Sequence, residues 1–106
     1  MQRLAAILTF LCLWYAGISA SSFAAEHKVV IDGMKYLPES LTVKAGDTIR
    51  WINKDPFPHT ATARSGGLDS PQIASGQSWK YVARKKGSYS VVCTLHPTMK
   101  GQLIVK

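Results

Sequence analysis

Beyond its first 24 residues, the chain contains no run of helical periodicity longer than a couple of turns. Short β-branched or apolar runs follow one another instead, separated by turns rich in Gly, Pro and Asp. In the run 48–53, Ile49, Trp51 and Asn53 occupy every second position, as expected for a strand with one buried face. About seven such runs in roughly 80 residues predict an all-β protein, a Greek-key β-sandwich of about seven to eight strands. The predicted strands cover residues 28–32, 41–43, 48–53, 60–63, 78–83, 88–93 and 102–105.

The turn 84–87 separates the predicted strands 78–83 and 88–93, so we expect these two strands to pair as a β-hairpin. Large side chains at alternating strand positions are expected to fill the space between the two sheets. The core candidates are Trp51, Trp79, Tyr81, Tyr89, Val91 and Leu103.

The N-terminal segment has the pattern of an export signal. Arg3 gives a positive start, and residues 4–18 are almost unbroken apolar sequence. A run of about 15 residues is short against the roughly 20 that span a bilayer, which favours a removable signal peptide over a retained membrane anchor. We therefore expect residues 1–24 to be a cleaved signal peptide, Ala25 to be the first mature residue, and residues 25–106 to form a single domain in the periplasm.

Cysteine usage limits how this domain is held together. Cys12 lies in the leader, and the bulky Leu11 before it does not suit lipid attachment, so the mature domain keeps only Cys93. A single thiol cannot form an internal disulfide, although small exported domains usually need a disulfide or a metal in addition to their core. We therefore expect a bound metal with Cys93 as its anchor.

Cys93, His96 and Met99 have the spacing C-x-x-H-x-x-M directly after a predicted strand. A tight loop of this kind can fold a thiolate, an imidazole and a thioether around one ion. His59 lies in a proline-flanked loop before another predicted strand, and a sandwich can bring it to the same end. Two imidazoles and a thiolate in a near-trigonal plane, with a weak axial thioether, suit one type 1 copper ion. Zinc is the competing metal, but zinc sites rarely use methionine, and structural ones usually draw on more cysteines.

In these residues the chain resembles the cupredoxin (type 1 blue-copper) family, and within it the amicyanin and plastocyanin-like proteins. The short ligand loop has the amicyanin-type spacing. The resemblance extends over nearly the whole mature region and rests on residues 34–36, 43–53, 58–59, 93–99 and Gly101.

The resemblance implies a role for each ligand. It makes His59 the buried imidazole and His96 the partly exposed one, through which electrons enter and leave. Cys93 is the strong ligand and Met99 the weak axial one. These four residues are the expected copper ligands.

Two positions depart from the family pattern. Thr60 stands where an asparagine usually follows the first histidine, and we expect it to reach Thr94 across the two ligand loops less easily. Leu95 stands where amicyanins have proline. We expect its backbone N–H to point at the Cys93 sulfur and to raise the reduction potential, because proline has no N–H to offer.

The sequence contains the parts of a redox carrier, with no sign of a substrate pocket or a general base. We therefore expect a monomeric periplasmic electron carrier, not an enzyme, that moves one electron at a time between Cu(I) and Cu(II). The expected partners are redox proteins, such as a cytochrome c or a periplasmic dehydrogenase with an acidic docking surface. The alternative is a periplasmic copper carrier or chaperone that delivers its ion to another protein.

The chain is basic, with a formal charge of +7 that becomes +6 when Arg3 is removed with the leader. The run 84–86 of Arg and Lys suggests a nucleic-acid binder, but export separates the chain from nucleic acid and no binding motif is present. We expect the charge to steer an acidic redox partner, without stable membrane insertion. Residues 56–58, Pro97 and Met34 form either an apolar docking collar around His96 or ordinary loop packing.

Cleavage after residue 24 would give the chain a second set of metal donors. The segment Ala25-Glu26-His27 would present a free amine, two amides and an imidazole, which suit Cu(II) in a square plane. The plain alternative is that His27 is an exposed residue before the first strand.

Overall fold

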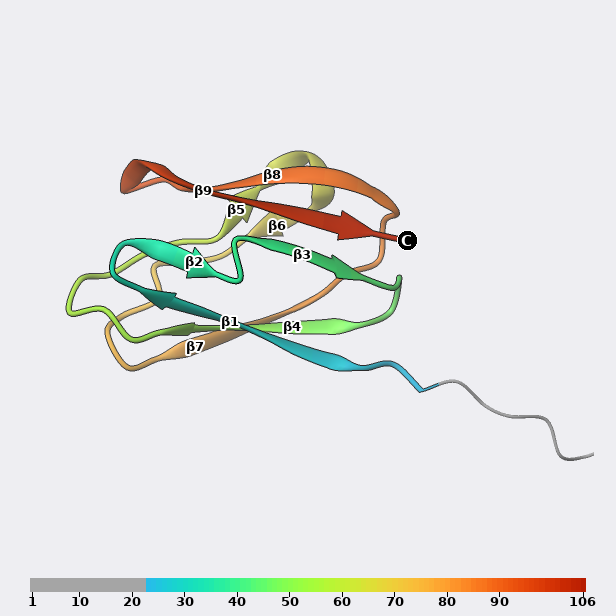
Figure 1. The fold of residues 1–106 in the computed structure, drawn as a ribbon, viewed down its shortest axis with the longest axis horizontal. Coiled ribbons are helices and arrows are strands. Elements are labelled where there is room, and N and C mark those ends of the chain that lie inside the picture. The colour runs from blue at the N-terminus through green and yellow to red at the C-terminus, as the bar shows by residue number, and fades with distance from the viewer. Residues whose placement is uncertain (1–22) are drawn as a thin grey trace, which may run out of the picture.

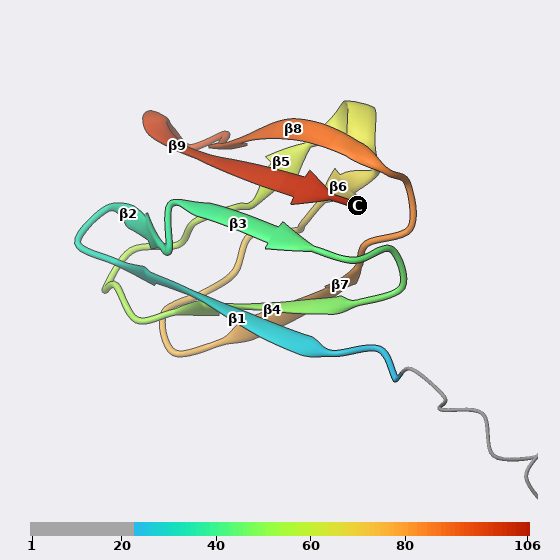
Figure 2. The same ribbon diagram turned by 45° about the vertical axis from the view of Figure 1, so that its right-hand side comes forward.

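The computed structural model describes residues 23–106, so that residues 1–22 of the predicted leader lie outside it. In the described part, nine strands form two mixed sheets that pack face to face as a β-sandwich (Figures 1 and 2). The strands are β1 (Glu26–Asp32), β2 (Lys35–Leu37), β3 (Ser40–Val43), β4 (Thr48–Asn53), β5 (Thr62–Ala63), β6 (Leu68–Asp69), β7 (Ser78–Val82), β8 (Gly87–Cys93) and β9 (His96–Val105). A 3-10 helix, η2 (Arg64–Gly66), lies between β5 and β6. Within residues 23–106, no helix is long and apolar enough to cross a membrane.

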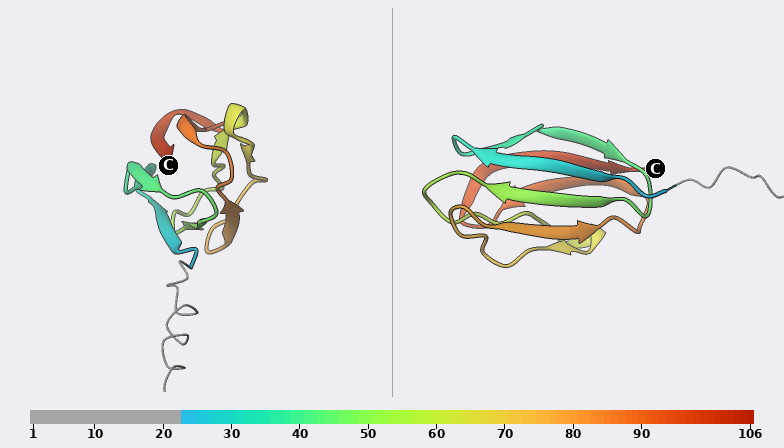
Figure 3. Two further views of the ribbon diagram at one scale, coloured as in Figure 1. Left: turned by 90° about the vertical axis from the view of Figure 1, so that its right-hand side faces the viewer. Right: turned by 90° about the horizontal axis from the view of Figure 1, so that it is seen from below.

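The two sheets have the strand orders β2-β1-β4-β7 and β3-β9-β8-β5-β6. β1 runs parallel to β4 and β3 runs parallel to β9, while the other paired strands are antiparallel. The strands follow the long axis of the sandwich, so the connections gather at its two ends (Figure 3). We call the end with the β1–β2 turn, the loop after β4 and the β8–β9 turn the ligand end. The distal end carries the start of β1 and the C-terminal residue.

The expected hairpin between strands 78–83 and 88–93 is wrong. β7 pairs with β4 in one sheet, whereas β8 pairs with β9 and β5 in the other, so the turn 84–87 crosses between the sheets (Figure 2). The Tyr89 hydroxyl donates hydrogen bonds to the carbonyls of Lys85 and Lys86 (2.8 and 3.1 Å), which helps to hold this crossing. A short turn between two strands serves a hairpin or a sheet crossing equally well, and long-range pairing decides between them.

Local periodicity predicted the individual strands more successfully than their pairing. β4 has the predicted bounds, and its buried residues alternate as expected. The last strand is much longer than predicted, because β9 begins at His96, opposite Cys93, and carries Met99. Between the predicted strands 60–63 and 78–83, the chain contains η2 and β6.

The core lies between the two sheets and includes four of the six candidates. The other two, Trp79 and Tyr81, are only partly buried. Both lie on β7 at the edge of its sheet, where their rings stack with centroids 6.2 Å apart. The buried candidates are Trp51, Tyr89, Val91 and Leu103.

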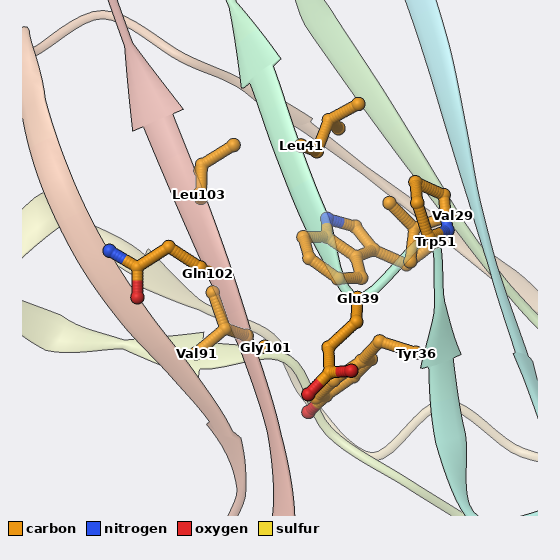
Figure 4. A pocket seen from close by; sticks show the side chains of 10 residues that line it. Val29, Tyr36, Glu39, Leu41, Trp51, Val91, Gly101, Gln102 and Leu103 are labelled. Atoms are coloured by element: carbon orange, nitrogen blue, oxygen red, sulfur yellow. The ribbon is translucent and has the colours of Figure 1, made fainter.

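A crevice lies where β2 and β3 approach β9, with the rings of Tyr36 and Trp51 in its wall (Figure 4). Gly101 forms the other side, and a Cβ there would lie 2.9 Å from the Glu39 carbonyl oxygen and 3.1 Å from the Tyr36 ring. Glycine at this position therefore lets β9 pass close to the β2–β3 connection. This close approach positions Tyr36, whose hydroxyl donates to the Thr60 carbonyl (2.6 Å) at the ligand end.

Candidate metal centre

Three of the expected ligands meet at the ligand end. The Nδ1 atoms of His59 and His96 each lie 3.7 Å from Cys93 Sγ. The ligand atoms of the three residues all lie within 4.8 Å of one another. The two imidazole rings have centroids 4.9 Å apart and are tilted by 55°. Two nitrogens and a sulfur therefore converge on a space suited to one ion.

Backbone pairing brings these side chains together from three segments. Cys93 ends β8 and faces His96, the first residue of β9, across a tight turn. His59 comes from the loop after β4, where its backbone makes a two-way bridge with Ile73. The His59 N–H donates to the Ile73 carbonyl (3.2 Å), and the Ile73 N–H donates to the His59 carbonyl (2.7 Å). The bridge orders a loop that the sequence shows only as proline-rich.

The expected ligands differ in exposure. His59 and Cys93 are completely buried, whereas His96 is partly exposed. Met99 is also buried and lies on β9, three residues after His96, where the spacing predicts the axial ligand. Of the two imidazoles, only that of His96 reaches the surface, where another protein can approach it.

Asp55 is a functional residue that the sequence analysis missed. It is buried, and its Oδ2 lies 2.8 Å from His59 Nε2. It also accepts the N–H groups of Gly33 (2.7 Å) and Met34 (2.9 Å), both of which have positive φ in the β1–β2 turn. With Nε2 donating to a carboxylate, His59 keeps the Nδ1 lone pair for the space beside Cys93. An aspartate four residues before a ligand histidine in the same loop was the available signal.

Several forces act on the Asp55 carboxyl group. Burial acts to raise its pKa, but hydrogen bonds from Met34, Gly33 and His59 outweigh burial and leave the pKa below the ordinary value. Asp55 is therefore an ionised carboxylate at neutral pH. Its negative charge orients His59 and favours a cation on the other side of the ring.

Asn53, the last residue of β4, is polar and completely buried, and hydrogen bonds satisfy its side-chain amide. Its side-chain amide donates to the carbonyls of Phe57 and Ile73, both at 2.8 Å, and its oxygen accepts the Asp55 N–H at 2.9 Å. These bonds satisfy a group that would otherwise be costly to bury. They also hold together both ends of the loop that carries His59.

Thr60 joins the two ligand loops and reaches Thr94 directly, although its side chain is shorter than that of the usual asparagine. The Thr94 N–H donates to Thr60 Oγ1 (2.9 Å), and the two hydroxyl oxygens lie 3.2 Å apart. The loops approach closely enough for a short side chain to bridge them, and Thr60 Oγ1 also contacts Thr62 Oγ1 (3.0 Å). The Thr60 N–H points at Cys93 Sγ (3.3 Å). No hydrogen bond from Leu95 to this sulfur occurs within residues 23–106, so that expectation is not met.

Tyr36 supports the same loop from beneath. Burial raises the pKa of its phenol, and the nearby Cys93 adds to the increase, so the hydroxyl stays protonated. It therefore remains a hydrogen-bond donor to the Thr60 carbonyl, directly after His59.

Apolar side chains are exposed on the loops that carry the ligands. Phe57 is 55% exposed, and Met34 is also exposed on the β1–β2 turn. Pro97 is exposed directly after His96, as are the prolines on either side of Phe57. All the residues of the expected collar therefore lie on the ligand end. The exposed side chain of Leu95, which the sequence analysis did not include, adds to this apolar surface.

The groups of the suggested N-terminal Cu(II) site lie at the distal end, and two of them are engaged elsewhere. The Ala25 N–H donates to Asp47 Oδ1 (2.9 Å), and His27 Nε2 lies 2.9 Å from Asp47 Oδ2. Glu26 begins β1 and forms ion pairs with Arg50 and Lys80. His27 also differs from the plain alternative, because it lies within β1 and is partly buried against Asp47 instead of being an exposed residue before the first strand.

The converging donors fit copper. Imidazole nitrogens suit Cu(II), while a thiolate and a thioether favour Cu(I), so such a set accommodates both oxidation states. A structural zinc site would usually contain more than the single cysteine found here.

Comparison with known proteins agrees with this chemistry. The cupredoxin-like domain family matches residues 5–105. Amicyanin from Paracoccus versutus is 35% identical over 95 residues, covering 84% of this chain and 72% of that protein. Amicyanin from Paracoccus denitrificans is 33% identical over 94 residues, covering 82% and 72%. The structure of an oxidised proline-to-alanine variant of amicyanin matches with a TM-score of 0.70 at 33% identity, covering 76% of this chain and 82% of that chain. The chain therefore belongs to the cupredoxin-like family, and its cofactor is copper.

Proposed function

We propose that this protein is an exported blue-copper electron carrier that passes single electrons between redox partner proteins. The proposed copper ligands are His59, Cys93, His96 and Met99. The observation that carries the proposal is the convergence of two imidazoles and a thiolate at one end of the sandwich, with all but one of them buried. A site of this kind suits electron exchange because it is closed to water yet reaches the surface at one ring.

The protein's part in electron transfer is to keep its ligands still. Bound copper supplies the one-electron step between Cu(I) and Cu(II). Asp55 holds the His59 ring from behind, and the Thr60 N–H holds the Cys93 sulfur. The hydroxyl of Thr60 also ties the loop of His59 to the loop of Cys93 through Thr94. Ligands that these hydrogen bonds hold in place move little when the charge of the copper ion changes.

The exposed apolar side chains around the ligand end suit brief contact with a partner. Phe57, Met34 and Leu95 lie on the loops that carry or support the ligands, and His96 is the partly exposed imidazole. Small interfaces are typical of electron-transfer encounters, because the complex must separate quickly. We propose a cytochrome c or a periplasmic dehydrogenase as partner, with His96 as the point of exchange.

Residues 1–24 are proposed to be a signal peptide removed on export to the periplasm. The positive start and the short apolar run 4–18 support this. Residues 25–106 then form the single copper domain.

The visible spectrum of the exported protein loaded with Cu(II) tests the proposal. We expect an intense blue band from charge transfer between the Cys93 thiolate and Cu(II), and its complete loss in Cys93→Ser with the far-UV circular dichroism unchanged. A colourless Cu(II) form of the intact protein would exclude a blue-copper site. Rapid transfer of copper to a competing apo-protein, without electron exchange with a cytochrome c, would identify a copper chaperone.

A further inference from the structure

Five exposed basic residues gather at the distal end, on segments that backbone hydrogen bonds hold together. The Ala45 N–H donates to the Lys106 carbonyl (2.8 Å), and the Gly46 N–H donates to the Ala83 carbonyl (2.6 Å). The Tyr89 hydroxyl, which donates to the carbonyls of Lys85 and Lys86, holds the turn that follows Ala83. We call these five residues the distal basic patch: Lys44, Arg84, Lys85, Lys86 and Lys106.

Few acidic side chains offset this patch. Asp47 is buried beneath it, and its two oxygens accept the N–H groups of Ala25 and Lys44 and contact His27. Glu26, the nearest exposed acid along β1, is paired with basic residues outside the patch. None of the ion pairs within residues 23–106 includes a patch residue. The five cations are therefore free to attract an anionic surface.

The patch is far from the proposed copper ligands. β8 begins at Gly87, beside the turn 84–87, and ends at Cys93. Seven residues of extended strand separate the two ends by about 20 Å. An acidic protein drawn to the patch would therefore lie at the wrong end of the molecule for exchange through His96.

We propose that the distal basic patch binds the surface of an anionic phospholipid membrane and turns the ligand end away from it. β1 begins at this same end, directly after the proposed leader, so the proposal rests on the proposed export, which would bring the distal end next to a membrane. Each Lys or Arg near an anionic bilayer strengthens binding by about fivefold. Binding there leaves the apolar loops and His96 open to partner proteins.

Vesicle sedimentation with the exported, copper-loaded protein tests this proposal. We expect binding to vesicles that contain phosphatidylglycerol but not to pure phosphatidylcholine vesicles. The triple variant Arg84→Gln, Lys85→Gln, Lys86→Gln should lose on the order of a hundredfold in partition coefficient at low salt. Raising the salt to 0.15 M should weaken wild-type binding, because the screening length falls to about 8 Å.

A matched triple variant separates this patch from net charge alone. Lys35→Gln, Lys54→Gln and Lys100→Gln remove the same charge from exposed positions at the ligand end. We expect this control to change the partition coefficient much less than the patch variant does. Equal losses in the two variants, or no preference for anionic vesicles, would overturn the proposal. Binding to polyglutamate but not to vesicles would assign the patch to an acidic protein instead. The blue band reports on the copper site separately, so a colourless protein that binds vesicles would disprove only the proposed redox function.

Discussion

The two ends of the sandwich are built around the same arrangement, a buried aspartate that accepts two backbone N–H groups and contacts one histidine Nε2. At the ligand end, Asp55 accepts the N–H groups of Gly33 and Met34 and lies 2.8 Å from His59 Nε2. These contacts tie the β1–β2 turn to the loop after β4.

At the distal end, Asp47 has the corresponding role. It accepts the N–H groups of Ala25 and Lys44 and lies 2.9 Å from His27 Nε2. These bonds, together with the Thr48 N–H bond to the Ala25 carbonyl (3.0 Å), hold the start of β1 against the turn before β4.

The two arrangements differ in what faces the other side of the imidazole ring. His59 is completely buried, and its Nδ1 lies 3.7 Å from Cys93 Sγ, beside His96. The side chain of His27 is 27% exposed and belongs to no such donor group. At both ends, the aspartate holds a histidine and two backbone N–H groups in place, and we call Asp47 and Asp55 the two clamps. A clamp prepares a metal ligand only where other donors converge on the free nitrogen.

Replacing each aspartate in turn is the strongest test of this difference. In Asp55→Asn, the amide cannot match a carboxylate as acceptor for His59, so we expect copper affinity to fall by about 10- to 100-fold. Asp47→Asn should leave the affinity unchanged, because Asp47 contacts His27 at the distal end, away from the converging donors. Competition with a chromophoric copper chelator measures both values. Equal losses in the two variants would mean that the clamps act on copper only through overall stability.

At the ligand end, the Thr60 side chain bridges the two ligand loops, and Thr60→Val removes this bridge with little change in volume. The Thr94 N–H would lose its acceptor, so we expect the free energy of unfolding to fall by about 1–2 kcal/mol. Thr42→Val is the matched control, because Thr42 is exposed on β3. Its effect should stay within about 0.5 kcal/mol. Urea unfolding of the copper-free proteins gives both values, and similar losses would show that the bridge contributes no stability.

The reduction potential sharpens the comparison further. Asp55→Asn removes a negative charge behind His59, which should favour Cu(I) and raise the potential by some tens of millivolts, equivalent to about 1 kcal/mol. The charge of Asp47 is at the far end of the sandwich, so Asp47→Asn should leave the potential unchanged. Voltammetry of the three blue proteins measures the shifts. A lower potential in Asp55→Asn would contradict the electrostatic explanation.

The smallest expected effect is an acid-side loss of stability at the distal end. Hydrogen bonds from Ala25, His27 and Lys44 lower the pKa of Asp47 from 3.8 to about 2. A lowered pKa means that the folded state favours the carboxylate, so its stabilisation is complete above about pH 4 and is lost as the pH falls through 2. Thermal unfolding of the copper-free protein should therefore show a shallower loss between pH 4 and 2 in Asp47→Asn than in the wild type. Identical pH profiles would show that the Asp47 clamp does not contribute.

Much of the fold could be predicted from local patterns. Alternation along 48–53 predicted the buried face of β4, because successive side chains of a strand point to opposite sides. The ligand loop was equally readable, since Cys93 and His96 lie close in sequence and a tight turn keeps their donor atoms 3.7 Å apart. His59 required the further assumption that a sandwich brings distant loops to one end.

The expected hairpin at 84–87 shows where local reasoning ended. A strand pattern predicts which side chains are buried, but it does not predict which neighbouring strand makes the backbone hydrogen bonds. β8 pairs with β5 and β9 and not with β7. The hydrogen bonds of Asp47 and Asp55 were not predicted either, because they come largely from N–H groups far away in sequence, that of Ala25 for Asp47 and those of Gly33 and Met34 for Asp55.

By itself, the sequence determined the strand periodicity, the type of metal donors and the overall positive charge, because these depend on residue identity and short spacing. Tertiary structure alone decided that His59 joins Cys93 and His96, that Asp55 stands behind it, and that the basic run lies at the opposite end. The physical reason is that burial, hydrogen bonding and charge separation depend on distances in space, and chain segments far apart in sequence acquire those distances only when the two sheets pack.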